Sequence, residues 1–235
     1  MTQQVLIGLL AEGTTDLRFL SSVVRRTFER VAFDCWDTIE IVEIIPLKSF
    51  QKGFADQVLD VSKSGRERYD ITVLCVHVDA DDRTDKTVIT HKIEPTLEIL
   101  NADTQERCRH LAWLIPVYMQ EAWMLADKSL LKKQIGTDKS DAELEIHRKP
   151  EEIANPKQVI EAAIRIARQS LPRRRRGELT IGDIYQSVGQ TIELNSLAVL
   201  PSYQKFERNV RKIFQDLRLL QSFGKENPDQ KKPHD

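Results

Sequence analysis

The sequence is poor in the residues that build zinc sites and disulfide frameworks. Its 235 residues include only three cysteines, Cys35, Cys75 and Cys108. They are odd in number and widely spaced, and no CxxC pair occurs, so neither a structural zinc site nor a disulfide scaffold is expected. This cysteine usage predicts a reducing, cytoplasmic location.

Long apolar runs and a strong charge of one sign are also missing. No stretch approaches the ~20 apolar residues of a membrane span, and the first residues lack the basic region of a signal peptide. The sequence therefore predicts neither a membrane contact nor secretion. Lys and Arg number 35 and Asp and Glu 36, a net charge of -1, so no overall positive field favours nucleic acid. A Walker A motif is absent, which excludes a P-loop ATPase.

The sequence does contain alternating strand and helix patterns. Short apolar runs predict four strands, over residues 5–10, 39–47, 71–78 and 111–117. Helical spacing of apolar residues predicts helices after the first three runs, and residues 121–127 are expected to begin a further helix. Pro95 predicts a kink or split in the third helix, and Pro116 places the fourth strand at an edge or marks its end. Such alternation favours a mostly parallel sheet flanked by helices.

The composition of the sequence changes after Ile135. Residues 136–150 are polar and predict a linker or long loop, and Asn155-Pro156 predicts the start of a helix that runs to about Gln169. Another helix is expected from Pro201. We therefore predict three parts: an α/β metal-binding domain, a helical extension that packs on it, and a disordered tail, over residues 1–135, 136–223 and 224–235.

Acidic residues follow the predicted strands. Glu12 follows the first, Asp79-Ala80-Asp81 the third and Glu121 the fourth. Sites in parallel sheets lie at the carboxyl ends of strands, so these acids are expected to meet there. Carboxylates held close together repel unless a cation lies between them, and hard oxygen ligands suit Mg²⁺ or Mn²⁺.

Each acid also has an ordinary structural explanation. An isolated Asp-x-Asp is more often a solvated loop that caps the next helix, although the deeply apolar run before Asp79 weakens that explanation. Asp82 either binds the metal or caps the next helix. Asp16 either supports the ligands or is a first-turn helix acid, and Glu121 either binds metal or caps its own helix.

The motifs together resemble a known family. The turn Glu12-Gly13-Thr14-Thr15-Asp16 and the later Asp79-Ala80-Asp81 resemble the Toprim domain of topoisomerases, DnaG-type primases and OLD-type nucleases. The segment Glu121-Ala122-Trp123-Met124-Leu125-Ala126-Asp127 resembles the small standalone Toprim-like proteins called DUF4276. Their C-terminal "P-S-F-x-x-F" segment is similar to residues 200–206, where Tyr203 replaces the usual aromatic. The resemblance is good over 1–127, patchy over 150–221 and absent in the tail.

The resemblance implies a Toprim-like fold with acid-bound Mg²⁺. Glu12, Asp79 and Asp81 are then the metal-binding and catalytic residues, with Glu121 as a further ligand and Asp16 and Asp82 supporting them. It also implies a nuclease, a hydrolase of phosphodiester bonds, that acts beside an ATPase partner in bacterial antiviral defence. A homo-oligomer is compatible with such a protein.

A basic run offers a nucleic-acid-binding surface. Pro172 and Gly177 flank Arg173, Arg174, Arg175 and Arg176, which predicts an exposed loop whose guanidinium groups contact phosphates. The alternatives are a solvated charged face or a docking site for an acidic partner protein. His77, Cys75, Trp113 and Trp123 are interpreted as packed core residues.

Two rival functions stay open. One is a catalytically silent Toprim-fold sensor or regulatory subunit, which the retained acids disfavour. The other is a glycosyltransferase that holds a metal and a diphosphate with Asp-x-Asp; the Glu12-Gly13 turn and the lack of an N-terminal nucleotide-recognition pattern argue against it. Strand passage is disfavoured because no tyrosine lies in a topoisomerase-like context.

Overall fold

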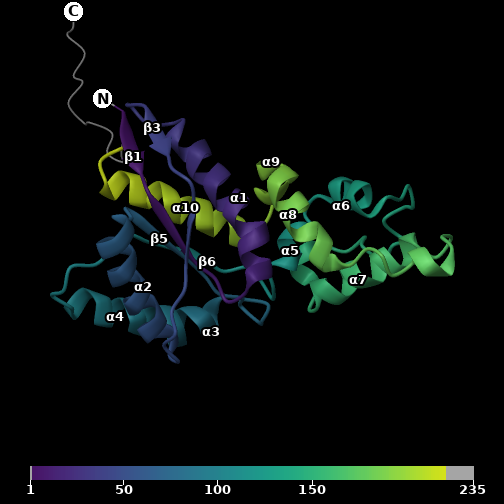
Figure 1. The fold of residues 1–235 in the computed structure, drawn as a ribbon, viewed down its shortest axis with the longest axis horizontal. Coiled ribbons are helices and arrows are strands. Elements are labelled where there is room, and N and C mark those ends of the chain that lie inside the picture. Colours follow the sequence, from purple (N-terminus) through teal and green to yellow (C-terminus); the bar gives the residue numbers. More distant parts are fainter. Residues whose placement is uncertain (1, 221–235) are drawn as a thin grey trace, which may run out of the picture.

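The apolar runs of the sequence form a parallel sheet in the computed structural model, which describes residues 2–220 (Figure 1). The main sheet has four strands in the order β4-β2-β5-β6, and all its pairs are parallel. The strands are β2 (Ile7–Leu10), β4 (Ile45–Leu47), β5 (Val73–His77) and β6 (Leu111–Leu114). The predicted α/β class with a parallel sheet flanked by helices is confirmed, and β6 is an edge strand, as Pro116 indicated.

Two of the predicted strands are each divided in two. β1 (Gln3–Val5) and β3 (Ile39–Ile41) pair in a separate, parallel two-stranded sheet. The single strands predicted over 5–10 and 39–47 are therefore wrong in their bounds. The first run breaks at Leu6, whose backbone N–H donates to the Thr72 hydroxyl and whose carbonyl accepts from the N–H groups of Thr72 and Val73.

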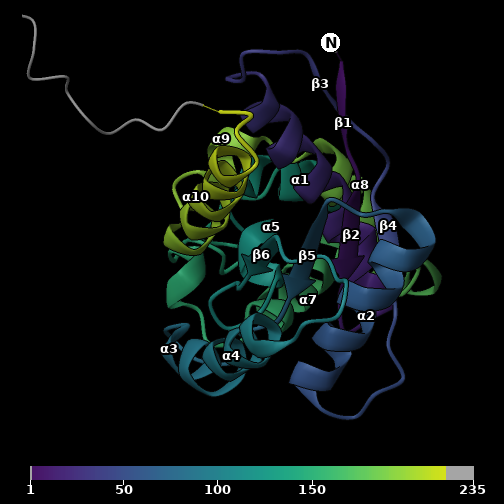
Figure 2. The same ribbon diagram turned by 90° about the vertical axis from the view of Figure 1, so that its left-hand side faces the viewer.

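Helices cover both faces of the main sheet (Figure 2). On one face lie α1 (Thr14–Ala32) and α10 (Pro201–Asp216), and on the other lie α2 (Phe54–Tyr69) and α4 (Glu94–Ala102). The side chains of β5 alternate between two buried clusters: Val73 and Cys75 belong to the cluster with α1 and α10, whereas Leu74 and Val76 belong to that with α2 and α4. A strand buried on both faces explains the unbroken apolar run from which it was predicted.

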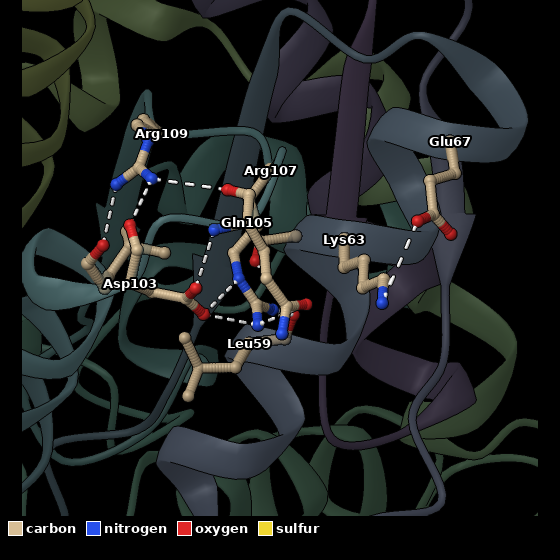
Figure 3. A network of polar contacts seen from close by, with 9 residues as sticks. Leu59, Lys63, Glu67, Asp103, Gln105, Arg107 and Arg109 are labelled. Carbon is tan, nitrogen blue, oxygen red and sulfur yellow. Dashed lines mark hydrogen bonds and ion pairs between the residues drawn. The ribbon is translucent and has the colours of Figure 1, made fainter.

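Short elements and polar contacts complete the α2 and α4 face. α3 (Lys86–Val88), a π-helical turn (Ile89–Ile93) and α4 follow one another without a break, and Pro95 takes a first-turn position in α4. The π-helical irregularity lies just before Pro95, and the chain is not split there. Arg107 binds the Asp103 carboxylate and the Leu59 carbonyl of α2 (Figure 3). Arg109 donates to the Leu100 carbonyl at 2.7 Å and to the Asp103 carbonyl at 2.6 Å. These bonds hold the segment that leads into β6 against two helices.

The helical part after β6 begins with short elements. A helix begins at Glu121, as expected, but α5 (Glu121–Met124) is a single turn, and a second helix, α6 (Lys128–Ile135), follows it. Residues 136–150 form a loop, but Leu144 and Ile146 within it are fully buried. The chain continues through a 3₁₀ turn (Pro150–Glu152), α7 (Pro156–Ala167), a 3₁₀ turn (Arg173–Arg175), α8 (Ile181–Thr191) and α9 (Leu194–Leu197).

Helix α8 was not predicted, and it packs closely on α1. A Cβ atom placed on Gly189 would lie 2.4 Å from the Phe19 carbonyl oxygen, so only glycine allows this approach of the two helices. The Arg26 guanidinium of α1 donates to the carbonyls of Gly189 and Ile192, each at 2.6 Å. It thereby satisfies carbonyls that the end of α8 leaves without helical partners.

The α/β and helical parts share one hydrophobic cluster, which contains Ile7 of β2, Ile160 of α7, Val188 of α8 and Phe206 of α10. In Figure 1, α6 and α7 lie at the end of the molecule away from α2 and α4, and α8 contacts α1, α6 and α7. The tail predicted over 224–235 lies outside the described residues. None of the helices within residues 2–220 is long and apolar enough to cross a membrane.

Candidate functional site

The carboxyl ends of the parallel strands bring sequence-distant polar residues to one edge of the sheet. β2 ends at Leu10, two residues before Glu12, and β5 ends at His77, two residues before Asp79. After β6 the chain turns into α5, which begins at Glu121. The predicted placement of these acids beyond neighbouring strand ends therefore matches the topology.

Asp16 and Gln120 connect two of these loops. Asp16 lies in the first turn of α1, and its Oδ2 accepts a hydrogen bond from the Gly13 N–H at 2.7 Å. Its Oδ1 accepts from the Gln120 side-chain amide at 2.5 Å. The Gln120 backbone N–H donates to Oδ1 of Asp79 at 3.0 Å. Gln120 is buried and holds both carboxylates in place; it was not predicted as a site residue.

His77 lies between the same two acids. Its Nε2 is 3.2 Å from Oδ1 of Asp79, and its Nδ1 is 3.9 Å from Oδ2 of Asp16. Burial alone lowers the pKa of His77, but the hydrogen bond and charge of Asp79, with the charges of Asp16 and Glu12, outweigh burial and raise that pKa above its ordinary value. His77 is buried, as predicted, and it is also part of the acidic edge. Its position two residues before Asp79 was the feature of the sequence that could have indicated this second role.

Glu121 is the most deeply buried acid of the group, with 5% of its surface exposed. Burial raises the pKa of its carboxyl, the hydrogen bond donated by the Tyr185 hydroxyl partly offsets this, and the charge of Asp79 raises it further. Burial and the neighbouring Glu121 also raise the pKa of Tyr185, which keeps the phenol a neutral donor. Tyr185 comes from α8, and the sequence analysis did not connect it with the site.

Asp81 and Asp82 lie in an exposed loop beside these residues. Asp81 has a left-handed backbone (φ 53°), and its N–H donates to the Tyr118 carbonyl at 3.0 Å. Residues two apart in a strand project to the same side of the sheet. Asp79 and Asp81 both lie beyond the end of β5, so this rule does not place their side chains together. Asp82 accepts a hydrogen bond from the Arg83 N–H at 2.6 Å, a local turn contact.

Acidic side chains predominate among the polar groups at this edge of the sheet. Carboxylates are the ligands that Mg²⁺ prefers, and Asp16 and Asp79 both bind Gln120 and lie beside His77. The charge of Glu12 contributes to the raised pKa of His77, and the charge of Asp79 contributes to the raised pKa of Glu121. Nδ1 of His77 and Oε1 of Gln120 are buried without a hydrogen-bond partner within residues 2–220. Orphaned buried polar atoms indicate a network that water or a ligand completes. The chemistry therefore fits a hard cation, although no three His, Cys, Asp or Glu side chains in that range are grouped tightly enough to enclose one.

The arginine run lies in the connection between α7 and α8, and all four side chains are exposed. Arg168 donates to the carbonyls of Arg175 and Arg176, and Nε of Arg176 donates to the Leu171 carbonyl at 2.9 Å. These bonds fix the backbone of the loop while Arg173 and Arg174 face solvent. The predicted exposed basic loop is confirmed as a structural feature.

Comparison of the chain with protein-family models, with curated proteins and with solved structures finds no match. The site therefore has to be interpreted from its own geometry.

Proposed function

We propose that this protein is a Toprim-type, divalent-metal-dependent nuclease of the DUF4276 kind that hydrolyses phosphodiester bonds. The observation that carries the proposal is that Asp16 and Asp79 flank buried His77 and both bind Gln120 at the carboxyl edge of a parallel sheet, with Glu12 and Glu121 in the adjoining loops. Its biological setting is proposed to be cytoplasmic antiviral defence beside an ATPase partner, as the family resemblance implies.

Under this proposal Glu12, Asp79 and Asp81 hold Mg²⁺ or Mn²⁺, with Glu121 as the buried ligand. Such an ion polarises a phosphoryl oxygen and lowers the pKa of water. The protein's own residues position the ligands: Gln120 and His77 fix Asp79, Gly13 and Gln120 fix Asp16, and Tyr185 fixes Glu121. Exposed Glu12 lies at the rim, where it also faces the substrate.

The test combines metal binding with cleavage. Asp79→Asn keeps the size of the side chain and removes its charge, so titration calorimetry should show at least tenfold weaker binding of Mn²⁺, and cleavage of single- and double-stranded DNA and RNA should be lost. Asp138→Asn is the matched control, because Asp138 is an exposed acid outside the acidic edge. Undiminished cleavage by the Asp79 variant would refute the proposal.

A silent sensor or regulatory subunit is the second candidate. One observation favours it: both oxygens of Asp16, and Oδ1 of Asp79, already accept hydrogen bonds from the protein itself. These hydrogen bonds stabilise the two carboxylates without a bound ion. Metal binding without cleavage of any of the four substrates, with or without the ATPase partner, would select this candidate over the nuclease.

A further inference from the structure

A loop with an exposed aromatic side chain faces the Glu12 turn. Lys48, Ser49 and Phe50 follow the end of β4, as Glu12 follows the end of β2, and β4 and β2 are neighbours in the sheet. A pocket of about 390 Å³ lies between the two segments, with Glu12, Gly13 and Thr14 on one side and Lys48, Ser49 and Phe50 on the other. The edge that carries the acids therefore continues onto this loop.

Phe50 is the most exposed large hydrophobic residue among those that the structure describes, at 98%. Its loop is nevertheless held by specific contacts. The Ser49 hydroxyl donates to Asp60 of α2 at 2.5 Å and accepts from the Gln51 N–H at 3.1 Å. The Gln57 amide donates to the Gln51 carbonyl at 2.9 Å. The loop thus presents an aromatic ring to solvent from a fixed backbone.

Lysines precede and follow Phe50 in the sequence, two positions away on each side. Lys48 and Lys52 are both exposed, and neither ammonium group is paired with a carboxylate in the part of the chain that the structure describes. An aromatic ring between two free cations is the combination that binds single-stranded nucleic acid, because bases stack on the ring while the cations contact phosphates.

We propose that Phe50 and Lys48 bind the single-stranded part of a nucleic acid whose backbone lies at the acidic edge. Phe50 stacks on an unpaired base and Lys48 contacts a neighbouring phosphate. The inference rests on the proposed function, since it names the substrate class of that site. A duplex does not use this contact, because its bases are already stacked on one another.

Fluorescence anisotropy tests the proposal without cleavage. The probes are a short labelled oligothymidylate and a labelled hairpin duplex, measured in EDTA. Phe50→Ala should weaken binding of the single strand about tenfold, in keeping with ~1–3 kcal/mol for one base stacked on an aromatic side chain, and should leave duplex binding unchanged. Phe50→Trp keeps an aromatic ring at this position and should bind the single strand as tightly as the wild-type protein. Lys48→Ala should reduce the salt dependence of log K by about 0.7, the value for one phosphate contact on a single strand.

Phe33→Ala is the matched control, since Phe33 is 93% exposed and lies outside this loop. Equal single-strand affinity of the wild-type protein and the Phe50→Ala variant overturns the inference, and it leaves the nuclease proposal intact if the wild-type protein cleaves in a separate assay with Mn²⁺. Equal losses on single strand and duplex overturn it as well. A wild-type protein that binds neither probe in EDTA and cleaves neither probe in Mn²⁺ refutes the inference and the proposed function together.

Discussion

The hydroxyl of Tyr185 donates a hydrogen bond to the buried carboxylate of Glu121, across 64 positions of the chain. Tyr185 belongs to α8 in the helical part, and Glu121 begins the helix that follows β6. The acidic edge is therefore completed by a segment that follows the α/β part in the sequence.

The first prediction concerns this bond. Tyr185→Phe removes the hydroxyl and keeps the ring, which leaves the Glu121 carboxylate buried without its donor. The expected cost is about 1–3 kcal/mol in the free energy of unfolding, measured by urea denaturation at neutral pH. Tyr69→Phe, on the 47%-exposed Tyr69, should change stability little. Equal stability of the two variants would show that the bond contributes nothing.

A second prediction concerns the attachment of α8 to α1. Arg26→Met preserves the apolar stem and removes the two hydrogen bonds to the Gly189 and Ile192 carbonyls. Charge-assisted bonds of this kind contribute about 1.5–3 kcal/mol, so a loss of stability of that size is expected in denaturant titration.

The neighbouring Arg25 provides the control for Arg26. Its guanidinium pairs with Glu29 one turn along α1, and both side chains are about half exposed. Arg25→Met should cost no more than about 0.5 kcal/mol. A similar cost for the two substitutions would mean that the carbonyls at the end of α8 are equally well satisfied by water.

A third prediction addresses the arginine run. Replacing Arg173, Arg174, Arg175 and Arg176 with serine should weaken nucleic-acid binding to a similar degree for all sequences, because phosphate contacts carry little sequence information. The salt dependence of binding should also become shallower, since each lost contact removes roughly one released counterion. Mn²⁺ affinity should stay the same. An unchanged salt slope together with the loss of a partner protein in a pull-down would assign the loop to protein docking instead.

Local patterns predicted the strands and the edge at which the acids lie, because apolar runs and the acids that follow them are contiguous in the sequence. Two features of the helical part were missed. The first is helix α8, whose start was marked in the sequence: Thr180 and Asp183 form a capping box, visible as Thr-x-x-Asp before an apolar helical pattern. The burial of Leu144 and Ile146 was not visible, since it depends on partners far along the chain.

The site partners were the hardest to predict. Gln120 and Tyr185 carry no charge, and their roles depend on which elements the tertiary fold brings together. Glu12 and Asp79, in contrast, were marked by the strand ends that precede them. Sequence spacing indicates which loops converge, whereas the hydrogen bonds between those loops depend on the tertiary packing of the whole edge.

The covering of β6 has a consequence for synthesis of the protein on the ribosome. The edge N–H of Trp113 donates to the Asn209 side chain of α10, which is 96 residues further along the chain. At roughly 5–20 residues per second, translation of that interval takes about 5–20 s, and for that time the nascent sheet has no α10 beside its edge strand. Exposed edge strands pair with other chains, so slow translation of this interval, or truncation before α10, should favour aggregation of the nascent chains.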